Sequence, residues 1–520
     1  MKKYIFKLIQ LFALLFILTQ SHAQFRIYPY WLPAEEGHLS VTWVTELPVP
    51  GQLTIWEEGK SDTVSLLSQP RFESGFAYSE LEESQRDSFP DMFKNANWKH
   101  HLIPVGLRAN TLYHYRVVQG EESYTATIKT MADLGSKMEV QFAVFADCET
   151  DPDGRKTYRK WSVGSQASMS SGRPDEVQTY LITETEGFNF NLESMAKSQP
   201  DFYMLPGDIV QGGGYQRAWD EFFYHMAGKF NKNITTAPLL PAIGNWENFG
   251  ARNGGYEPQA VAKARNKYRS YFNLPANNNP QYKNYYYRTD YGPVTVITLD
   301  SSNGLPDSTD FDTNINISAS TYPGDDLPDI NPGSDQWKWA MEELEDASSA
   351  GQIIFVQFHH IPYSSGGHSL PLTAYKSSGQ AGIPMRAYTP AFKKYGVVAV
   401  FCGHNESLEH SIVDGIHFWD IGIAGDGFGY SIDDIDARRK NIYRQWVAHR
   451  DAEEMWNGQQ LISGGKHYGH LWVEVVPNSQ GYDINMTPKY IFPVTDKEGK
   501  VTMVEERIYD HVVKVKKSMP

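Results

Sequence analysis

Short apolar runs recur between residues 138 and 401, and polar or glycine-rich segments separate them. They are rich in β-branched and aromatic residues and do not alternate with polar residues, which is typical of strands buried on both faces. The runs lie at 140–146, 202–205, 294–299, 353–358 and 397–401. They predict the central strands of a sheet.

Two segments between these runs have apolar residues at helical spacing. In the first, 215–229, they are Trp219, Phe222, Phe223 and Met226; in the second, 336–347, they are Trp337, Ala340, Met341 and Leu344. Strands that alternate with helices predict an α/β domain. We assign this domain to residues 138–475 and expect a C-terminal β extension over 476–520.

Residues 25–132 have a different pattern. Apolar and polar residues alternate over 39–44, 52–56 and 113–117, and prolines, glycines and asparagines stand between these stretches. Short alternating strands with such turns predict an all-β sandwich. The alternative, that this region is part of a larger single β-domain, stays open at this point.

The first 23 residues have the pattern of a signal peptide. Three lysines precede an apolar run over 8–18, and Ser21-His22-Ala23 provides small residues for cleavage after Ala23. We therefore expect a secreted or periplasmic protein, with an uncleaved anchor as the alternative. No later stretch is apolar over 18 residues, so no transmembrane segment is expected after removal of the signal.

Composition narrows the class of protein. The chain has 520 residues, 13% of them aromatic, and a net charge of −15. Such aromatic content excludes general disorder, and the negative charge argues against a nucleic-acid polymer as partner. Two cysteines, Cys148 and Cys402, exclude a disulfide scaffold; buried free thiols or one disulfide remain possible. The acidic segment 303–335 is expected to be a solvated loop, with a calcium site as the alternative.

Metal-binding side chains follow four of these apolar runs and a fifth apolar segment at 238–243. The carboxyl ends of strands in open α/β sheets converge on one crevice, so these side chains are expected to meet. Carboxylate, amide and imidazole groups together suit one or two divalent metals. The residues are Asp147 and Glu149, Asp208, Asn245, His359 and His360, and His404 and Glu406.

This ordered set resembles the motifs of the calcineurin-like metallophosphoesterases. Together with the N-terminal β region it is similar to the purple acid phosphatase branch, in which a fibronectin type III-like domain precedes the catalytic domain. The resemblance covers residues 27–475. It implies a two-sheet β-sandwich flanked by helices, with a two-metal site at its edge.

The resemblance also implies roles for single residues. Asp208 would bridge two divalent metals and Asp147 would hold the first. Asn245, His359 and His404 would hold the second. A hydroxide that bridges the metals would attack a phosphate mono- or diester, either a small molecule or a headgroup.

Three departures from the family pattern affect the metals. Glu149 and Glu406 stand where the family commonly has histidine. We expect both residues to ligate the first metal, or one to ligate it and the other to hold a bound water. Such oxygen ligands favour Mg, Mn or Ca over Zn. Gln211 replaces the tyrosine of the purple enzymes, so iron–tyrosinate pairing is not expected.

Trp246 stands where the family motif has a histidine that assists the leaving group. We expect Trp246 to line the substrate site, and His360 is the candidate catalytic residue. His368 and His410 are weaker candidates for the same role. Two alternatives stay open: a binding protein that has lost turnover, and a carbohydrate-active enzyme that uses Glu149 and Glu406 without metal.

Overall fold

The computed structural model describes most of the chain. The described residues are 25–88, 97–150, 152, 158, 160, 172–302, 327–369, 381–427, 441–448, 455–464 and 468–518. The expected signal peptide and most of the acidic segment 303–335 lie outside them. Among the described residues, no helix combines the length and the apolar character that a membrane span requires.

The N-terminal region is a sandwich of two four-stranded sheets, ordered β1-β2-β6-β5 and β4-β3-β7-β8. Its core contains Trp31 and Trp43, and the ring centroids of Trp31 and Tyr115 lie 5.2 Å apart. The strands are β1 (Phe25–Pro33), β2 (Leu39–Thr45), β3 (Gly51–Glu57), β4 (Thr63–Ser68), β5 (Arg71–Phe72), β6 (Trp98–Leu102), β7 (Leu112–Gln119) and β8 (Glu122–Lys129).

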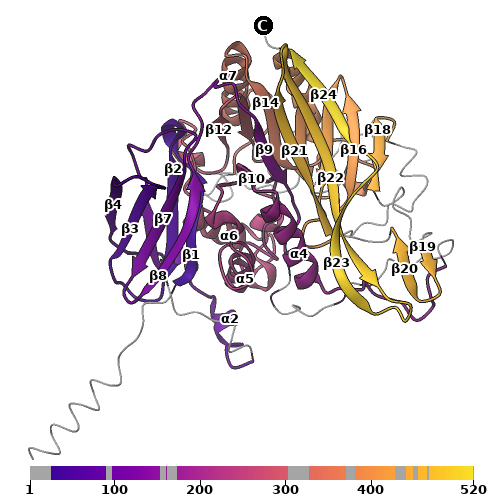
Figure 1. The fold of residues 1–520 in the computed structure, drawn as a ribbon, viewed down its shortest axis with the longest axis horizontal. Coiled ribbons are helices and arrows are strands. Elements are labelled where there is room, and N and C mark those ends of the chain that lie inside the picture. The colour runs from indigo at the N-terminus through magenta and orange to yellow at the C-terminus, as the bar shows by residue number, and fades with distance from the viewer. Residues whose placement is uncertain are drawn as a thin grey trace, which may run out of the picture.

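Two seven-stranded sheets form the larger part of the molecule (Figure 1). In the first, the order is β11-β10-β9-β21-β22-β23, and β24 also pairs with β22. Its strands are β9 (Val140–Val144), β10 (Phe202–Leu205), β11 (Leu239–Pro241), β21 (Tyr468–Pro477), β22 (Gly481–Thr495), β23 (Val501–Ile508) and β24 (Val513–Ser518).

The second sheet has the order β12-β13-β14-β15-β17-β16-β18. Its strands are β12 (Tyr287–Tyr291), β13 (Val294–Thr298), β14 (Ile353–His360), β15 (Ala399–Gly403), β16 (Leu408–Val413), β17 (Ile416–Ile421) and β18 (Arg444–Val447). A separate hairpin pairs β19 (Met455–Asn457) with β20 (Gln460–Ser463).

Aromatic residues join the two large sheets. Phe142 of β9 stacks on Phe202 of β10 and meets Phe355 of β14 edge to face, with ring centroids 5.4 Å apart. Phe401 of β15 lies in the same core. The expected α/β class, a two-sheet sandwich with helices behind an all-β domain, is therefore confirmed.

Helices pack against the two large sheets and between these sheets and the N-terminal sandwich. In Figure 1, α5 and α6 lie between the N-terminal sandwich and the large sheets, and α4 lies beside them. A capping box at Thr183 and Glu186 begins α4. The helices are α2 (Glu80–Glu83), α4 (Glu184–Lys197), α5 (Gln216–Met226), α6 (Pro258–Tyr271), α7 (Asp335–Ser349) and α8 (Thr389–Tyr395). The sequence pattern predicted α5 and α7 but did not single out α4 or α6.

The last strands continue a sheet of the larger part. β21 pairs antiparallel with β9, and β22 pairs with β21, β23 and β24. The segment 476–520 that we expected to be an extension thus adds β22–β24 to the sheet that contains β9. As domain limits, the boundaries at 132, 138 and 475 remain predictions.

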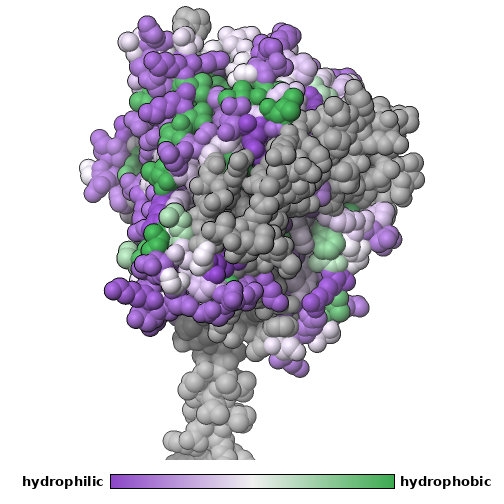
Figure 2. Space-filling view, turned by 90° about the vertical axis from the view of Figure 1, so that its right-hand side faces the viewer, coloured by the Kyte–Doolittle hydropathy of each residue, from purple (hydrophilic) through white to green (hydrophobic). Residues whose placement is uncertain are grey.

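The described surface is mainly hydrophilic on the side drawn in Figure 2. Figure 2 shows a side on which hydrophilic residues predominate and apolar residues stand in small groups among the described atoms.

Both cysteines, Cys148 and Cys402, are buried free thiols.

Candidate metal centre

The backbone turns sharply at four of the expected ligands. Asp147, Asp208, His404 and Glu406 have φ angles of 54°, 48°, 83° and 45°. Non-glycine residues rarely adopt this left-handed region, and such strain concentrates at functional sites. These turns follow β9, β10 and β15 and direct the side chains across the strand ends.

Glycines before the ligands let the strand ends approach closely. A Cβ at Gly403 would collide with the Asp147 carboxylate, and one at Gly244 would collide with Asp208. Gly207 has φ +92°, and a Cβ there would lie 2.7 Å from the His359 Cβ. Each glycine is thus required by the side chain that lies against it.

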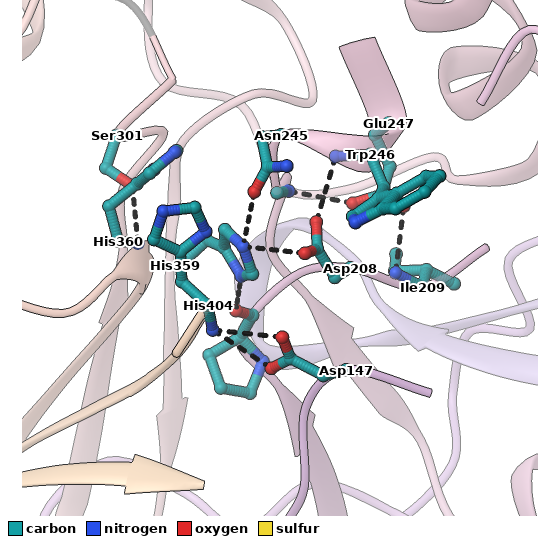
Figure 3. Close-up of polar contacts among 12 residues, drawn as sticks. Asp147, Asp208, Ile209, Asn245, Trp246, Glu247, Ser301, His359, His360 and His404 are labelled. Carbon is teal, nitrogen blue, oxygen red and sulfur yellow. Dashed lines mark hydrogen bonds and ion pairs between the residues drawn. The ribbon is translucent and has the colours of Figure 1, made fainter. Parts of the chain in front are cut away.

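His359 presents a lone pair to two oxygen atoms (Figure 3). Its Nδ1 lies 3.1 Å from the Pro206 carbonyl oxygen, which can only accept, so Nδ1 carries the proton. Burial lowers the pKa of His359, which favours the neutral ring. Nε2 then faces Asn245 Oδ1 at 2.8 Å and Asp208 Oδ2 at 2.9 Å. Three acceptors that converge in this way fit a cation between them.

Backbone amides hold the two aspartates. The Trp246 amide donates to Asp208 Oδ1 at 2.9 Å. The His404 amide donates to both Asp147 oxygens, at 3.0 and 3.1 Å. The first bond joins the end of β10 to the segment after β11, and the second pair joins the ends of β9 and β15, so the strand ends orient the carboxylates.

The candidate ligand atoms form three overlapping groups. Within each group, one ligand atom per residue lies within 4.8 Å of the others. Asp208 belongs to two groups, and Glu149 also belongs to two. The groups are Asp208, His359 and His404; Asp147, Glu149 and Asp208; and Glu149, Glu406 and Asp426.

The structure therefore brings together every residue that we expected to ligate a metal. Asn245 joins through its contact with His359. Glu406 lies with Glu149 rather than in the group of Asp147 and Asp208. Asp426 was missed, although it follows β17 in a glycine-rich segment and so carries the same strand-end signal as the others.

The buried carboxylates of this cluster favour bound cations. Burial raises the pKa of Asp147, Glu149 and Asp208, and neighbouring carboxylates raise it further. Within the described part of the chain, no lysine or arginine forms an ion pair with these three acids. Bound metal ions would supply the charge that keeps such buried carboxylates ionised.

Glu247 connects two of the turns that carry candidate ligands. Its Oε1 accepts from the amides of Ile209 and Val210, at 2.8 and 3.2 Å, and Oε2 accepts from the Gly244 amide at 2.8 Å. The side chain is fully buried and ties the turn after Asp208 to the turn before Asn245. The sequence pattern did not single out this residue.

His360 lies beside the metal cluster and is fully buried. Its Nδ1 lies 2.8 Å from Ser301 Oγ, and its ring centroid lies 4.5 Å from that of His404. His368 is half-buried and its ring lies equally close to His404. His410 belongs to a different cluster, with His417 and His511.

An aromatic cavity of about 410 Å³ adjoins the cluster. Trp246 lines it, and the backbone amide of the same residue binds Asp208. Phe249 meets Trp246 edge to face, with ring centroids 5.2 Å apart. Gln211 lies in this wall as well, and the remaining lining residues are Pro152, Tyr215, Ala251 and Arg252.

A comparison with known proteins identifies the family of the chain. A family model described as calcineurin-like phosphoesterase matches residues 142–405, which is just over half of the 520 residues. The chain belongs to the calcineurin-like phosphoesterase family. The predicted family is thus confirmed, and the chain is a hydrolase of phosphoric esters. No curated protein matches this phosphoesterase significantly in sequence.

One solved structure supports the fold. Purple acid phosphatase PPD1 from yellow lupin (Lupinus luteus) has a TM-score of 0.56 and 12% identity, over 92% of this chain and 74% of that one. GAP50, the anchor in the inner membrane complex of Plasmodium, matches with a TM-score of 0.32 and 14% identity, over 72% and 90% of the two chains. Phosphopantetheinyl hydrolase of Mycobacterium tuberculosis matches with 0.25 and 13%, over 55% and 89%.

Proposed function

We propose that the chain is an exported, metal-dependent phosphoesterase that hydrolyses phosphate mono- or diesters of a small molecule or headgroup. The observation that carries this proposal is the convergence of Asn245 Oδ1 and Asp208 Oδ2 on His359 Nε2, at 2.8 and 2.9 Å. Asn245, Asp208, His359 and His404 would hold one divalent ion. Asp147, Glu149 and Asp208 would hold the other.

When bound, two divalent metals would supply an acidified water and neutralise charge on the phosphate. The chain's own residues orient these ligands. Pro206 fixes the tautomer of His359, and the His404 amide fixes Asp147. Oxygen ligands predominate, so Mg, Mn or Ca would be preferred to Zn.

The aromatic cavity would hold the leaving group. Trp246 occupies the position of the usual histidine, and it offers an apolar wall where that residue would donate a proton. An ester whose leaving group is a ring, aromatic or sugar, would pack against Trp246 and Phe249. A leaving group that departs without protonation suits this wall best.

His360 remains a candidate for a catalytic role. Its complete burial and its contacts with Ser301 and His404 favour a positioning role, in which it holds the ring of His404. His368 is the more exposed of the histidines against His404.

Replacement of Asp208 tests the function directly. Asp208→Asn should reduce phosphate release by several orders of magnitude and lower the metal content, because this carboxylate belongs to two ligand groups. The matched control Asp414→Asn removes an exposed carboxylate in the same fold and should change neither. Phosphate release from a substrate panel and elemental analysis measure the two effects. Full activity after chelation would contradict the proposal.

Trp246→Ala tests the cavity. The KM for an aryl phosphate should rise about fivefold, since an aromatic contact contributes roughly 1 kcal/mol. The KM for methyl phosphate should stay constant and is the internal control. An equal change for both substrates would mean that Trp246 does not select the leaving group.

A phosphate-binding protein without turnover is the second candidate, and Trp246 is the observation that favours it. It predicts retained metal and bound inorganic phosphate, but no phosphate release from any ester. Trp246→His would then be expected to gain measurable hydrolysis, because general acid catalysis contributes about 10²–10⁴-fold.

A further inference from the structure

The carboxylate group Glu149, Glu406 and Asp426 lies at the edge of the two ligand groups already described. One oxygen of each residue lies within 4.8 Å of the others. Three oxygens around one Ca²⁺ at about 2.4 Å would be separated by at most about 4.8 Å. The spacing thus fits one hard cation that is held by oxygen alone.

A buried, unpartnered oxygen points to a ligand there. Glu149 is 2% exposed, and its Oε2 has no hydrogen-bond partner. An ionised oxygen left bare in the interior is strongly unfavourable. If each of the two groups that contain Glu149 held its own cation, both carboxylate oxygens of Glu149 would be used.

Backbone hydrogen bonds and a glycine fix the segment that contains Asp426. The amides of Gly425 and Asp426 both donate to the Asp147 carbonyl oxygen, at 3.1 Å each. A Cβ at Gly425 would lie 2.9 Å from the Cys148 Cα, so only glycine lets the segment after β17 lie this close to the turn after β9. Asn191 donates to the carbonyl of Ala424 at 3.1 Å and holds the segment from the other side.

The charge of the whole cluster supports a further cation. Five carboxylates converge, those of Asp147, Glu149, Asp208, Glu406 and Asp426. Two divalent ions would leave one net negative charge at a site that must admit a phosphate dianion. Three divalent ions would leave one net positive charge, which attracts the substrate.

We propose that Glu149, Glu406 and Asp426 bind a third divalent cation of the Ca²⁺ or Mn²⁺ class, with Glu149 as the bridge to the first metal. The inference rests on the proposed function, because Glu149 is shared with the two-metal site. The three ligand groups are linked by shared residues, Asp208 between the first two and Glu149 between the last two. The outer ion would help to draw in the phosphate and would leave the inner pair as the reaction centre.

Metal counting tests this proposal without an activity assay. The mature protein is stripped with a chelator and dialysed to equilibrium against MnCl₂ at physiological salt, and bound manganese per chain is measured by elemental analysis. We expect three ions in the wild type, two in Asp426→Asn, and three in the control Asp414→Asn. Thermal unfolding of each stripped variant checks that it is folded, and Glu406→Gln, also expected to bind two, is the second variant.

Each other outcome is decisive. Two ions in the wild type, or three in folded Asp426→Asn and Glu406→Gln, would overturn the third site and leave the proposed function intact. No bound manganese in the wild type would overturn both.

Discussion

At the scale of single residues, backbone conformation decides where the ligands point. Asp147, Asp208 and His404 each accept a left-handed φ, and glycines beside them leave no room for a side chain. The strain is concentrated where the candidate ligands meet. We therefore expect small changes of backbone there to affect metal binding more than stability.

Gly207→Ala isolates this effect. The substitution places a Cβ at φ +92° and 2.7 Å from the His359 Cβ, so His359 must shift and metal content should fall. The matched control is Gly333→Ala, where φ is +95° and nothing lies within 4 Å. Both should lose about 1–2 kcal/mol of unfolding free energy from the left-handed backbone. Only Gly207→Ala should lose metal by elemental analysis; equal metal loss in both would contradict the role of His359.

At the scale of elements, a cluster of histidines joins the last strands to β16 and β17. His410 Nδ1 lies 3.0 Å from His511 Nε2, and His410 Nε2 lies 2.9 Å from His417 Nδ1. His511 stacks on Trp446 of β18, with ring centroids 4.8 Å apart. This cluster links residues after β23 to the second large sheet, although β23 belongs to the first.

The cluster predicts a loss of stability in acid. Burial lowers the pKa of His410 to about 2 and that of His417 to about 4, and burial also lowers the pKa of His511, against the effect of Asp510. The unfolded chain takes up these protons near pH 6.5. The contribution to stability is therefore complete above pH 6.5 and decreases as the pH falls toward 4 and below.

His511→Phe tests this linkage. The variant keeps a ring against Trp446 but has one titratable group fewer. The slope of unfolding free energy against pH between 6.5 and 5 should become smaller by up to about 1.4 kcal/mol per pH unit. His114→Phe, which replaces a histidine stacked on Trp56 in the sandwich, is the control. Urea unfolding at several pH values measures the slopes, and an unchanged slope in His511→Phe would refute the assignment.

At the scale of the whole molecule, a buried ion pair joins the N-terminal sandwich to the larger part. Arg26 of β1 donates to Asp220 of α5, with Nη2 2.6 Å and Nε 3.1 Å from Oδ1. The two side chains are 1% and 4% exposed. Tyr78 also donates to Asp220, at 2.5 Å. The sandwich and the phosphoesterase part are therefore expected to unfold together.

Arg26→Met should destabilise the protein by about 3–5 kcal/mol, because it leaves Asp220 buried without its cation. Arg86→Met, which breaks a pair whose side chains are 34% and 44% exposed, should cost less than about 1 kcal/mol. Urea unfolding followed by tryptophan fluorescence and circular dichroism measures both variants. A loss below 1 kcal/mol in Arg26→Met would show that the pair does not hold the two parts together.

The sequence alone determined the central strands and the polar residues that end them. Apolar runs such as 202–205 and 353–358 became β10 and β14, because residues buried on both faces need a continuous apolar pattern. The ligand candidates Asp208 and His359 followed from their place at these strand ends. These signals are local, so a single chain can reveal them.

Tertiary structure decided what comes together across long separations. Asp426 meets Glu149 only because β17 pairs with β15, which brings the segment after β17 against the turn after β9. The C-terminal strands join the sheet of β9 through the pairing of β21, which the alternation of residues could not reveal. Strand order depends on packing between distant segments, and periodicity along the chain carries no record of which strands pair.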